Sequence, residues 1–203
     1  MLTDENSALA GKLRESNLVG EANHPSIGPG MSKSDYVDRV FRIELNNVSH
    51  HIKNVHTKQT DIPSGLPGKG NVIAIMGWVK PIGKIGETLR DALENPDQNV
   101  CFSVRSFTND ERVGGVTYKK FVTIITWDWV VSPGIAIANK YNTLGMESLF
   151  STEIDLQTLN NVYFNIQTNP AANESDRGTL KYIDSIKRSV DVSDTTSELL
   201  KSW

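Results

Sequence analysis

The chain has 203 residues, with 21 Lys plus Arg against 24 Asp plus Glu and a formal net charge of −3. This length fits one compact domain with its own hydrophobic core, so we expect a single domain over residues 1–203. The nearly balanced charge gives no electrostatic footprint for nucleic acid or for an anionic membrane, and we expect neither as a partner. The single cysteine, Cys101, excludes an intramolecular disulfide and any multi-cysteine metal site.

The N-terminal stretch 1–16 is polar and weakly periodic, which predicts a short surface helix or an arm. It carries acidic residues where a secretory signal needs basic ones. No run in the sequence approaches the roughly 18 apolar residues that a membrane span requires. We therefore expect a soluble protein made in a cytoplasm.

Loops and strands alternate in the first part of the chain. Glycine and proline are so frequent in residues 17–36 that this stretch, which contains His24, is predicted to be mostly loop. Alternating apolar and polar residues predict two paired strands over 40–45 and 48–55. Residues 60–71 are rich in Gly and Pro and long enough for a mobile loop.

The middle of the chain carries the clearest strand and helix patterns. Residues 71–79 form a nearly continuous apolar run, which predicts a buried strand, and 84–95 have helical spacing with a proline at the end. Residues 99–107 alternate as a strand, 108–117 read as a charged turn or exposed loop, and 118–131 form the longest strand expected. The organisation predicted is an arm (1–16), a core (17–140), a helical C-terminal part (141–190) and a tail (191–203).

The strand over 99–107 carries a hydroxyl and a cation on one face. Val100, Phe102 and Val104 alternate onto one side, which leaves Ser103 and Arg105 as neighbours on the other. A serine in a strand is usually structural. It becomes a candidate nucleophile when a base, an orienting group and oxyanion donors can reach it.

Asp128 lies among apolar residues of the strand over 118–131. An ionised carboxylate in such a place needs a cation or hydrogen-bond donors. A backbone or arginine contact would be a structural partner, whereas a histidine whose tautomer the acid fixes would be a functional one. Both readings stay open at this point. His24 is the upstream candidate base, although a loop histidine is more often solvated.

The turn that follows Asp128 is a candidate oxyanion site. The chain turns at Pro133 and Gly134 into a stretch with helical character, and the free backbone N–H groups near Gly134 and Ile135 could donate hydrogen bonds to a developing oxyanion. The spacing of the histidines in 50–56 does not favour a metal site, and no cofactor is expected.

Three short motifs in this order resemble the prohead core proteases of large tailed phages, whose fold is similar to that of the herpesvirus assemblins. The motifs are GEANHP at 20–25, SVR at 103–105 and DWVVSP at 128–133. The resemblance spans about residues 17–140. It implies an α+β fold in which helices surround a mainly antiparallel, barrel-like sheet, with a catalytic His24 and Ser103.

The third catalytic residue is the point at which the chain departs from the assemblins, which use a second histidine there. Asp128 stands at the comparable place, and His50, next to Ser49, is the alternative. A structural reading of His50, as a histidine bonded to backbone within the sheet, is preferred. Arg105 is open between an oxyanion or substrate contact and a structural partner for an acid.

The function expected is that of a serine endopeptidase. Ser103 would attack, His24 would act as the base and Asp128 would orient it. The resemblance implies cleavage of scaffold and capsid proteins after glutamate, inside the assembling prohead in the host cytoplasm, and suggests a homodimer. Glu153 and Glu198 are candidate self-cleavage sites, although an ordinary surface loop is the preferred interpretation of each segment. The alternatives are a non-catalytic scaffold or capsid-interaction protein and another serine hydrolase that uses the same dyad.

Overall fold

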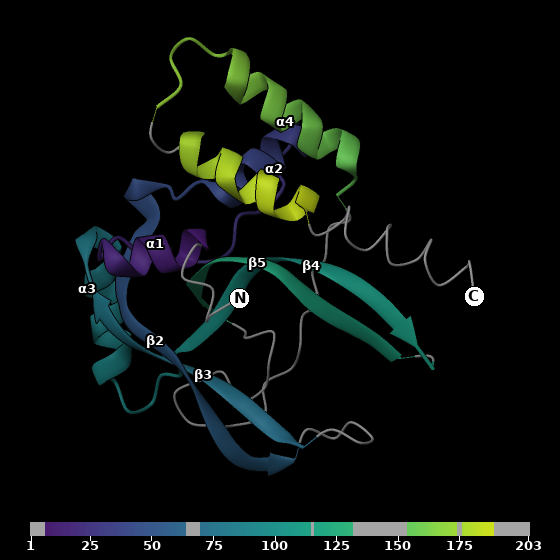
Figure 1. The fold of residues 1–203 in the computed structure, drawn as a ribbon. Helices are drawn as coiled ribbons and strands as arrows, with labels where there is room; N and C mark the ends of the chain where they lie inside the picture. Colours follow the sequence, from purple (N-terminus) through teal and green to yellow (C-terminus); the bar gives the residue numbers. More distant parts are fainter. Residues whose placement is uncertain (1–6, 64–69, 115, 132–153, 174–175, 189–203) are drawn as a thin grey trace.

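The computed structural model describes residues 7–63, 70–114, 116–131, 154–173 and 176–188. Two antiparallel sheets lie below a group of helices (Figure 1). The α+β class expected from the sequence is confirmed. The described strands form two open sheets, so the expected barrel-like arrangement is not seen in this part of the chain. The first sheet has the order β1 (Val19–Glu21), β2 (Val48–Pro63), β3 (Asn71–Pro81), and the second pairs β4 (Cys101–Val113) with β5 (Val116–Val130).

The two sheets meet along β1 and β5. Thr126 Oγ1 donates to the Val19 carbonyl at 2.6 Å, and just beyond β1 the Asn23 N–H donates to the Trp129 carbonyl at 2.7 Å. Gly20 allows this approach, because a Cβ atom at this position would lie 2.0 Å from the Trp127 carbonyl oxygen. The end of β1 is therefore held directly against the strand that carries Asp128.

The helices pack on the sheets in two groups (Figure 1). One group contains α2, α4 and the segment 176–188, which share a core with Ile125 of β5. The other group contains α1 and α3, which contact β2. None of the described helices is long and apolar enough to cross a membrane. The bounds are α1 (Ala8–Arg14), α2 (Lys33–Phe41), the 3-10 helix η1 (Leu45–Asn47), α3 (Gly83–Glu94), α4 (Leu156–Thr168) and a helical segment over 176–188.

The strand predicted over 40–45 is wrong. Ser32 and Asp35 form a reciprocal capping box that begins α2, and Val37, Val40 and Phe41 are buried at helical spacing. Phe41 stacks on Phe107 of β4, with ring centroids 4.7 Å apart. Local capping and helical spacing therefore determine this stretch, and the alternation seen from 40 onwards does not.

Two segments predicted as loops belong largely to hairpins. β2 continues to Pro63 and β3 begins at Asn71, so the 60–71 loop shortens to the tip of a hairpin. Likewise, most of 108–117 pairs within β4 and β5. Cross-strand pairing of Asp110 with Lys119 and of Glu111 with Tyr118 carries both strands through this polar sequence.

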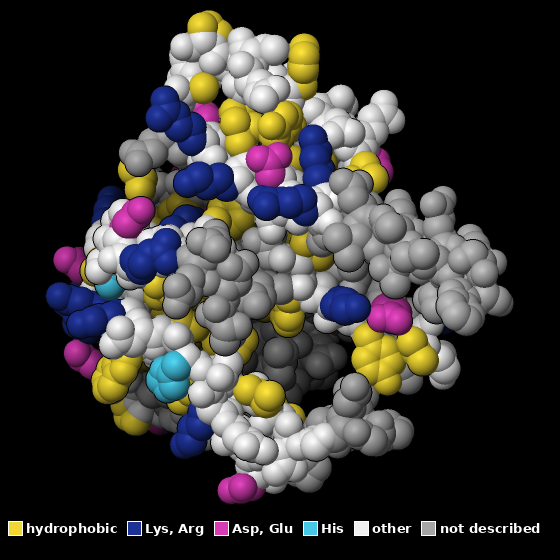
Figure 2. Space-filling view, viewed as in Figure 1, with side chains coloured by type: hydrophobic (Ala, Val, Ile, Leu, Met, Phe, Trp, Pro, Cys, Tyr) yellow, Lys and Arg dark blue, Asp and Glu magenta, His cyan; other side chains and the backbone are white. Residues whose placement is uncertain are grey.

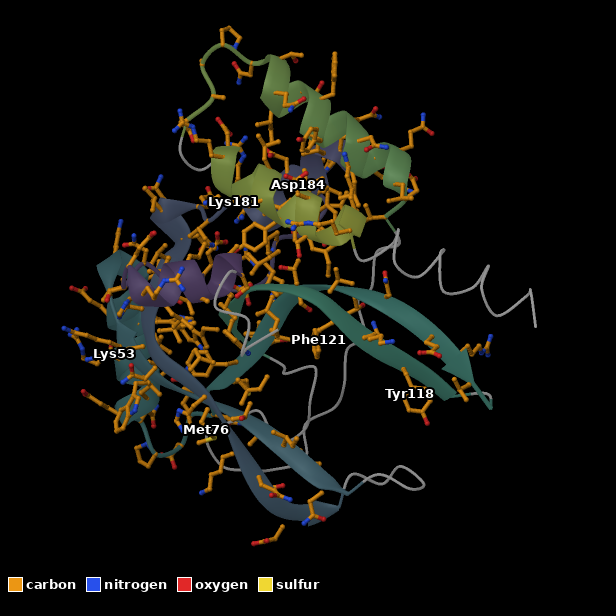
Figure 3. The ribbon with its side chains drawn as sticks, in the orientation of Figure 1. Lys53, Met76, Tyr118, Phe121, Lys181 and Asp184 are labelled. Atoms are coloured by element: carbon orange, nitrogen blue, oxygen red, sulfur yellow. The ribbon has the colours of Figure 1, made fainter. Side chains whose placement is uncertain are left out.

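The prediction that 71–79 is a buried strand is right about the strand and wrong about its burial. Ile73 is 64% exposed and Trp78 is 70% exposed, because no element among the described residues covers these parts of β3. Exposed hydrophobic side chains are visible where this hairpin lies (Figure 2). Met76 of β3 and Phe121 of β5, in the β4–β5 hairpin, are also partly exposed (Figure 3).

A β-bulge changes the faces of β5. Strict alternation groups Ile125 with Trp127, but the register shifts between Arg105 and Ser106 of β4. As a result, Ile124 packs with Trp127, whereas Ile125 joins the helical core on the other side. The alternation holds on the stretch before the bulge, which contains Ser103 and Arg105.

Candidate active site

Asp128 is the centre of the site, and its carboxylate accepts hydrogen bonds from Glu21, His24 and Arg105. Its Oδ1 accepts from the Glu21 N–H at 3.0 Å and from Arg105 Nη2 at 2.8 Å. Its Oδ2 accepts from Arg105 Nε at 2.8 Å and from His24 Nδ1 at 2.7 Å. The residue has no exposed surface. Histidine and arginine therefore share one buried acid, so both partners that the sequence left open are present.

The charge on Asp128 is stabilised by these contacts. Burial alone would raise its pKa, but the hydrogen bond from His24 and the charge and hydrogen bonds of Arg105 outweigh burial and hold the pKa below its ordinary value. The acid is therefore a carboxylate at neutral pH. A carboxylate only accepts hydrogen bonds, so His24 carries its proton on Nδ1, and Nε2 is the basic nitrogen of the ring.

His24 lies in the loop that follows β1, and its side chain is 39% exposed. The residue before it, Asn23, has a left-handed backbone with φ of 64° and is fixed by its hydrogen bond to Trp129. Asparagine tolerates this conformation better than most residues. The Nδ1 edge of the imidazole therefore meets Asp128 while the ring still reaches solvent, as a base that serves a substrate must.

Ser103 lies on β4 directly opposite Asp128 on β5, and it is partly buried. Side chains at directly opposed positions point to the same face of the sheet. No hydrogen bond joins the Ser103 hydroxyl to His24, both of which are described. Catalytic hydrogen bonds are often long before substrate binds, so this geometry is compatible with a nucleophile and its base.

Arg105 is buried and its guanidinium serves internal acceptors. Besides its two bonds to Asp128, it forms an ion pair with Glu21 Oε2 at 3.2 Å. Its Nη1 donates to the carbonyls of Val40 and Arg42 at 3.4 and 3.2 Å. These contacts favour the structural alternative for Arg105, a partner for an acid, over an oxyanion or substrate contact.

Glu21 is the member of this cluster that sequence reasoning missed. The residue has no exposed surface and accepts from both terminal nitrogens of Arg39, at 3.1 and 2.6 Å, and from the Glu44 N–H at 2.6 Å. Burial alone would raise its pKa, but the hydrogen bond from Arg39 and the charge of Arg105 hold it below the ordinary value. The partners lie 18 or more residues away and partly on a helix, so no local spacing could reveal them.

His50, the alternative third member, is buried on β2 and its hydrogen bonds go to other partners than Asp128. Its Nε2 bonds to the Trp127 carbonyl at 3.1 Å and its Nδ1 to the Ser49 hydroxyl at 2.8 Å. Because a carbonyl only accepts, Nε2 carries the proton and Ser49 donates to Nδ1. Burial lowers the pKa of His50 to about 4, so the ring is neutral near pH 7. The contact to backbone matches the structural reading of this histidine.

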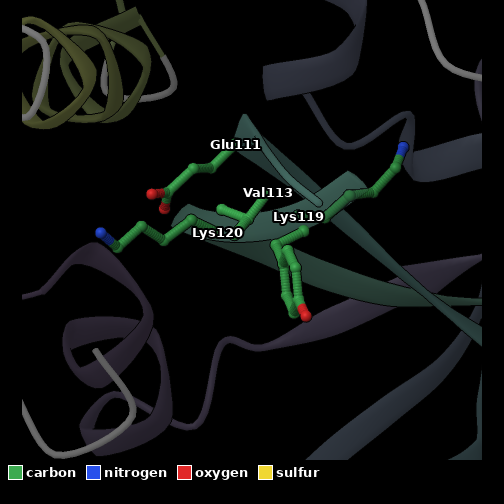
Figure 4. Close-up of a pocket in the computed structure, with 5 residues that line it drawn as sticks. Glu111, Val113, Lys119 and Lys120 are labelled. Atoms are coloured by element: carbon green, nitrogen blue, oxygen red, sulfur yellow. The ribbon is translucent and has the colours of Figure 1, made fainter. Parts of the chain in front are cut away.

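The oxyanion candidates Gly134 and Ile135 lie outside the described residues, as do Glu153 and Glu198. The described residues contain no group of three or more His, Cys, Asp or Glu side chains placed to hold a metal ion. A cavity of about 450 Å³ lies near the tip of the β4–β5 hairpin (Figure 4). It is lined by Glu111, Val113, Tyr118, Lys119 and Lys120. With a rise of about 3.3 Å per residue, this end of β4 lies roughly 26 Å from Ser103, so the cavity is separate from the cluster around Asp128.

Comparison with known proteins shows the family of the chain. A capsid maturation protease of Pseudomonas phage phiKZ is 32% identical over 146 residues, which cover 70% of this chain and 52% of that relative. The chain thus spans about half the length of the curated relative that it matches. No solved structure matches the chain. Residues 1–186 match the model of the peptidase S80 family. This match and the phage relative confirm the resemblance to phage prohead proteases that the three motifs indicated. The chain belongs to the peptidase S80 family.

Proposed function

We propose that this protein is a serine endopeptidase that processes scaffold and capsid proteins as a phage head matures. The observation that carries the proposal is the position of Asp128. It bonds to Nδ1 of His24 and lies directly opposite Ser103, the relationship expected of an acid, a base and a nucleophile. The peptidase family and the phage relative support the same reading.

The proposed reaction proceeds in two steps. Ser103 Oγ forms a bond to the scissile carbonyl carbon while His24 Nε2 takes the hydroxyl proton, and Asp128 stabilises the imidazolium that results. His24 then protonates the leaving amine as the C–N bond breaks, and a water molecule activated by His24 releases the acyl group. Backbone N–H groups near Gly134 and Ile135 are the proposed oxyanion donors, while Arg105 holds Asp128 in place.

The substrate assignment rests on the family resemblance. We propose cleavage after glutamate in scaffold and capsid proteins, within the assembling prohead of an infected cell. A homodimer, and self-cleavage at Glu153 or Glu198, belong to the same proposal. Each can be tested separately from the catalytic residues.

The direct test compares the wild-type protein with Ser103→Ala on a peptide from the capsid or scaffold protein that contains a glutamate. The matched control is Ser106→Ala, a serine on the same strand on the other side of the bulge. We expect cleavage by the wild type and by Ser106→Ala, and none by Ser103→Ala. Equal cleavage by wild type and Ser103→Ala would contradict the assignment of the nucleophile.

Two further measurements separate the alternatives. Exchanging the glutamate for glutamine in the peptide tests specificity, and we expect cleavage to fall strongly. A fluorophosphonate probe should label Ser103 only. Turnover of simple esters without peptide cleavage would indicate another serine hydrolase, and absence of labelling and of all turnover would indicate a non-catalytic capsid or scaffold protein.

A further inference from the structure

Two buried carboxylates share one guanidinium beside the proposed base. Arg105 Nη2 lies 2.8 Å from Asp128 Oδ1 and 3.2 Å from Glu21 Oε2. The backbone N–H of Glu21 also donates to Asp128 at 3.0 Å. Neither acid has exposed surface. Glu21 therefore contacts the orienting acid directly through its backbone and indirectly through Arg105.

The charges of this cluster have a consequence for His24. If Asp128 and Arg105 were alone, the guanidinium would neutralise the acid and oppose a positive imidazole beside it. Glu21 offsets the charge of Arg105, while Arg39 in turn pairs with Glu21 and with the exposed Glu44. The charges of two buried acids, the buried Arg105 and the partly exposed Arg39 then balance in this cluster.

We propose that Glu21 is a positioning residue: it holds Arg105 against Asp128, and its charge favours the protonated form of His24 that the reaction requires. The catalytic part of this inference rests on the proposed function. The effect on the protonation of His24 does not, because that effect depends only on the contacts described here.

The expected signs follow from the charged groups of the cluster beside His24, which include Asp128 on β5, Arg105 on β4, Glu21 on β1, Arg39 on α2 and Glu44 before η1. Lys12 on α1 interacts with the charge of Arg105 and His50 on β2 with that of Asp128, and both stay the same in every variant. Glu21→Gln removes one negative charge and disfavours the imidazolium. Arg39→Met removes one positive charge and favours it. The double variant Glu21→Gln/Arg39→Met restores the balance.

The first test follows the ring protons of His24 by NMR as pH changes, in the 203-residue chain carrying Ser103→Ala so that no turnover occurs. Only four histidines need assignment, and His24→Gln identifies the signal. We expect Glu21→Gln to move the titration midpoint about 0.5 to 1 pH unit lower, Arg39→Met to move it higher, and the double variant to return it. Asp176→Asn is the matched control, because Asp176 is a buried acid paired with Arg42 and does not contact Asp128.

The second test uses the chain with Ser103 intact. We expect Glu21→Gln to lower kcat/KM about 10-fold and to move the acid limb of its pH profile in the same direction as the NMR midpoint. A purely structural role would reduce the amount of active protein and scale the profile without moving it. In the double variant, the acid limb should return to its original position.

The proposal is overturned if Glu21→Gln is folded, as shown by unchanged signals of the other histidines, and shifts the His24 midpoint by less than about 0.2 unit. A double variant whose shift exceeds that of Glu21→Gln would also overturn it. If Glu21→Gln does not fold, the Arg39→Met variant decides alone. A His24 titration midpoint that fails to rise in Arg39→Met would then contradict the inference. If the wild type cleaves no peptide, the proposed function fails while the titration still tests Glu21.

Discussion

Ser103 on β4 lies directly opposite Asp128 on β5, so one ladder of backbone hydrogen bonds fixes the proposed nucleophile relative to the acid. Neighbouring strands lie about 4.8 Å apart, and opposed side chains share a face. The proposed base, His24, comes from a loop instead and reaches the acid through its Nδ1. Two of the three proposed catalytic residues thus owe their relative position to a single hairpin.

Replacing Asp128 with asparagine should reduce both activity and stability. The amide cannot hold the Nδ1–H tautomer of His24, so we expect kcat to fall by about 10³ to 10⁴. It also removes one of the two buried carboxylates that pair with Arg105, which should lower the free energy of unfolding by about 3 kcal/mol. Peptide cleavage and urea unfolding measure the two effects. Asp110→Asn, an exposed acid on the same hairpin, should change neither.

Replacing Arg105 with lysine keeps the charge and removes the paired hydrogen bonds to Asp128. An ammonium group cannot reproduce the two-point contact, the ion pair with Glu21 and the bonds to two carbonyls together. We expect the free energy of unfolding to fall by about 2 to 4 kcal/mol. Arg112→Lys, on the exposed end of β4, is the control and should stay within about 0.5 kcal/mol of wild type in urea. A similar loss in both variants would contradict this role for Arg105.

Gly20 and Gly28 lie in the same part of the sequence but differ in the space around them. A Cβ atom at Gly20 would lie 2.0 Å from the Trp127 carbonyl and 2.5 Å from the His50 ring, whereas nothing lies within 4 Å at Gly28. We expect Gly20→Ala to destabilise by about 3 kcal/mol or more, because β1 must move away from β5. Gly28→Ala should be within about 1 kcal/mol of wild type. Thermal unfolding of the two variants compares them directly.

The stability of the fold should depend on pH through His50. Burial lowers the pKa of its imidazole to about 4, whereas an unfolded histidine titrates near 6.5. The unfolded chain therefore binds a proton that the folded chain does not, so stability is lost as pH falls from about 6.5 to about 4. The loss should reach roughly 3 kcal/mol over this window.

His50→Gln should remove most of this dependence, although its own stability will be lower. His56→Gln, an exposed histidine on the same strand, should retain it. Urea unfolding at pH 7.0 and pH 4.5 measures how much the free energy of unfolding of each protein changes with pH. An equal change in the free energy of unfolding between the two pH values in His50→Gln and wild type would show that other groups cause the pH dependence.

The sequence predicted the parts of the site that local pattern determines. Alternation in 99–107 put Ser103 and Arg105 on one face, and the acid among apolar residues at Asp128 correctly required partners. His24 could be connected to them only through the resemblance, because no spacing links a loop to a strand more than 100 residues away. Glu21 was missed for the same reason.

The errors in the fold also have physical causes. The capping box of Ser32 and Asp35 starts a helix, α2, which runs into the segment where a few alternating residues had suggested a strand. Periodicity identified β3 but could not report that no described element covers Ile73 or Trp78. The bulge beside Arg105, which regroups Ile124 and Ile125, leaves no signal in the pattern of either strand.

The attachment of the His24 loop has a consequence for the way activity is lost. The backbone contacts that join this loop to β5 belong to one parallel bridge, in which Ala22 pairs with Trp129 and the Asn23 N–H donates to the Trp129 carbonyl. Opening them would separate His24 from Asp128 while β4 and β5 stay paired. Local opening of this kind needs less free energy than global unfolding. Hydrogen exchange at the Asn23 amide should therefore report the fraction of molecules in which His24 has separated from Asp128. On warming, activity should be lost at a lower temperature than the one at which the β-sheets unfold.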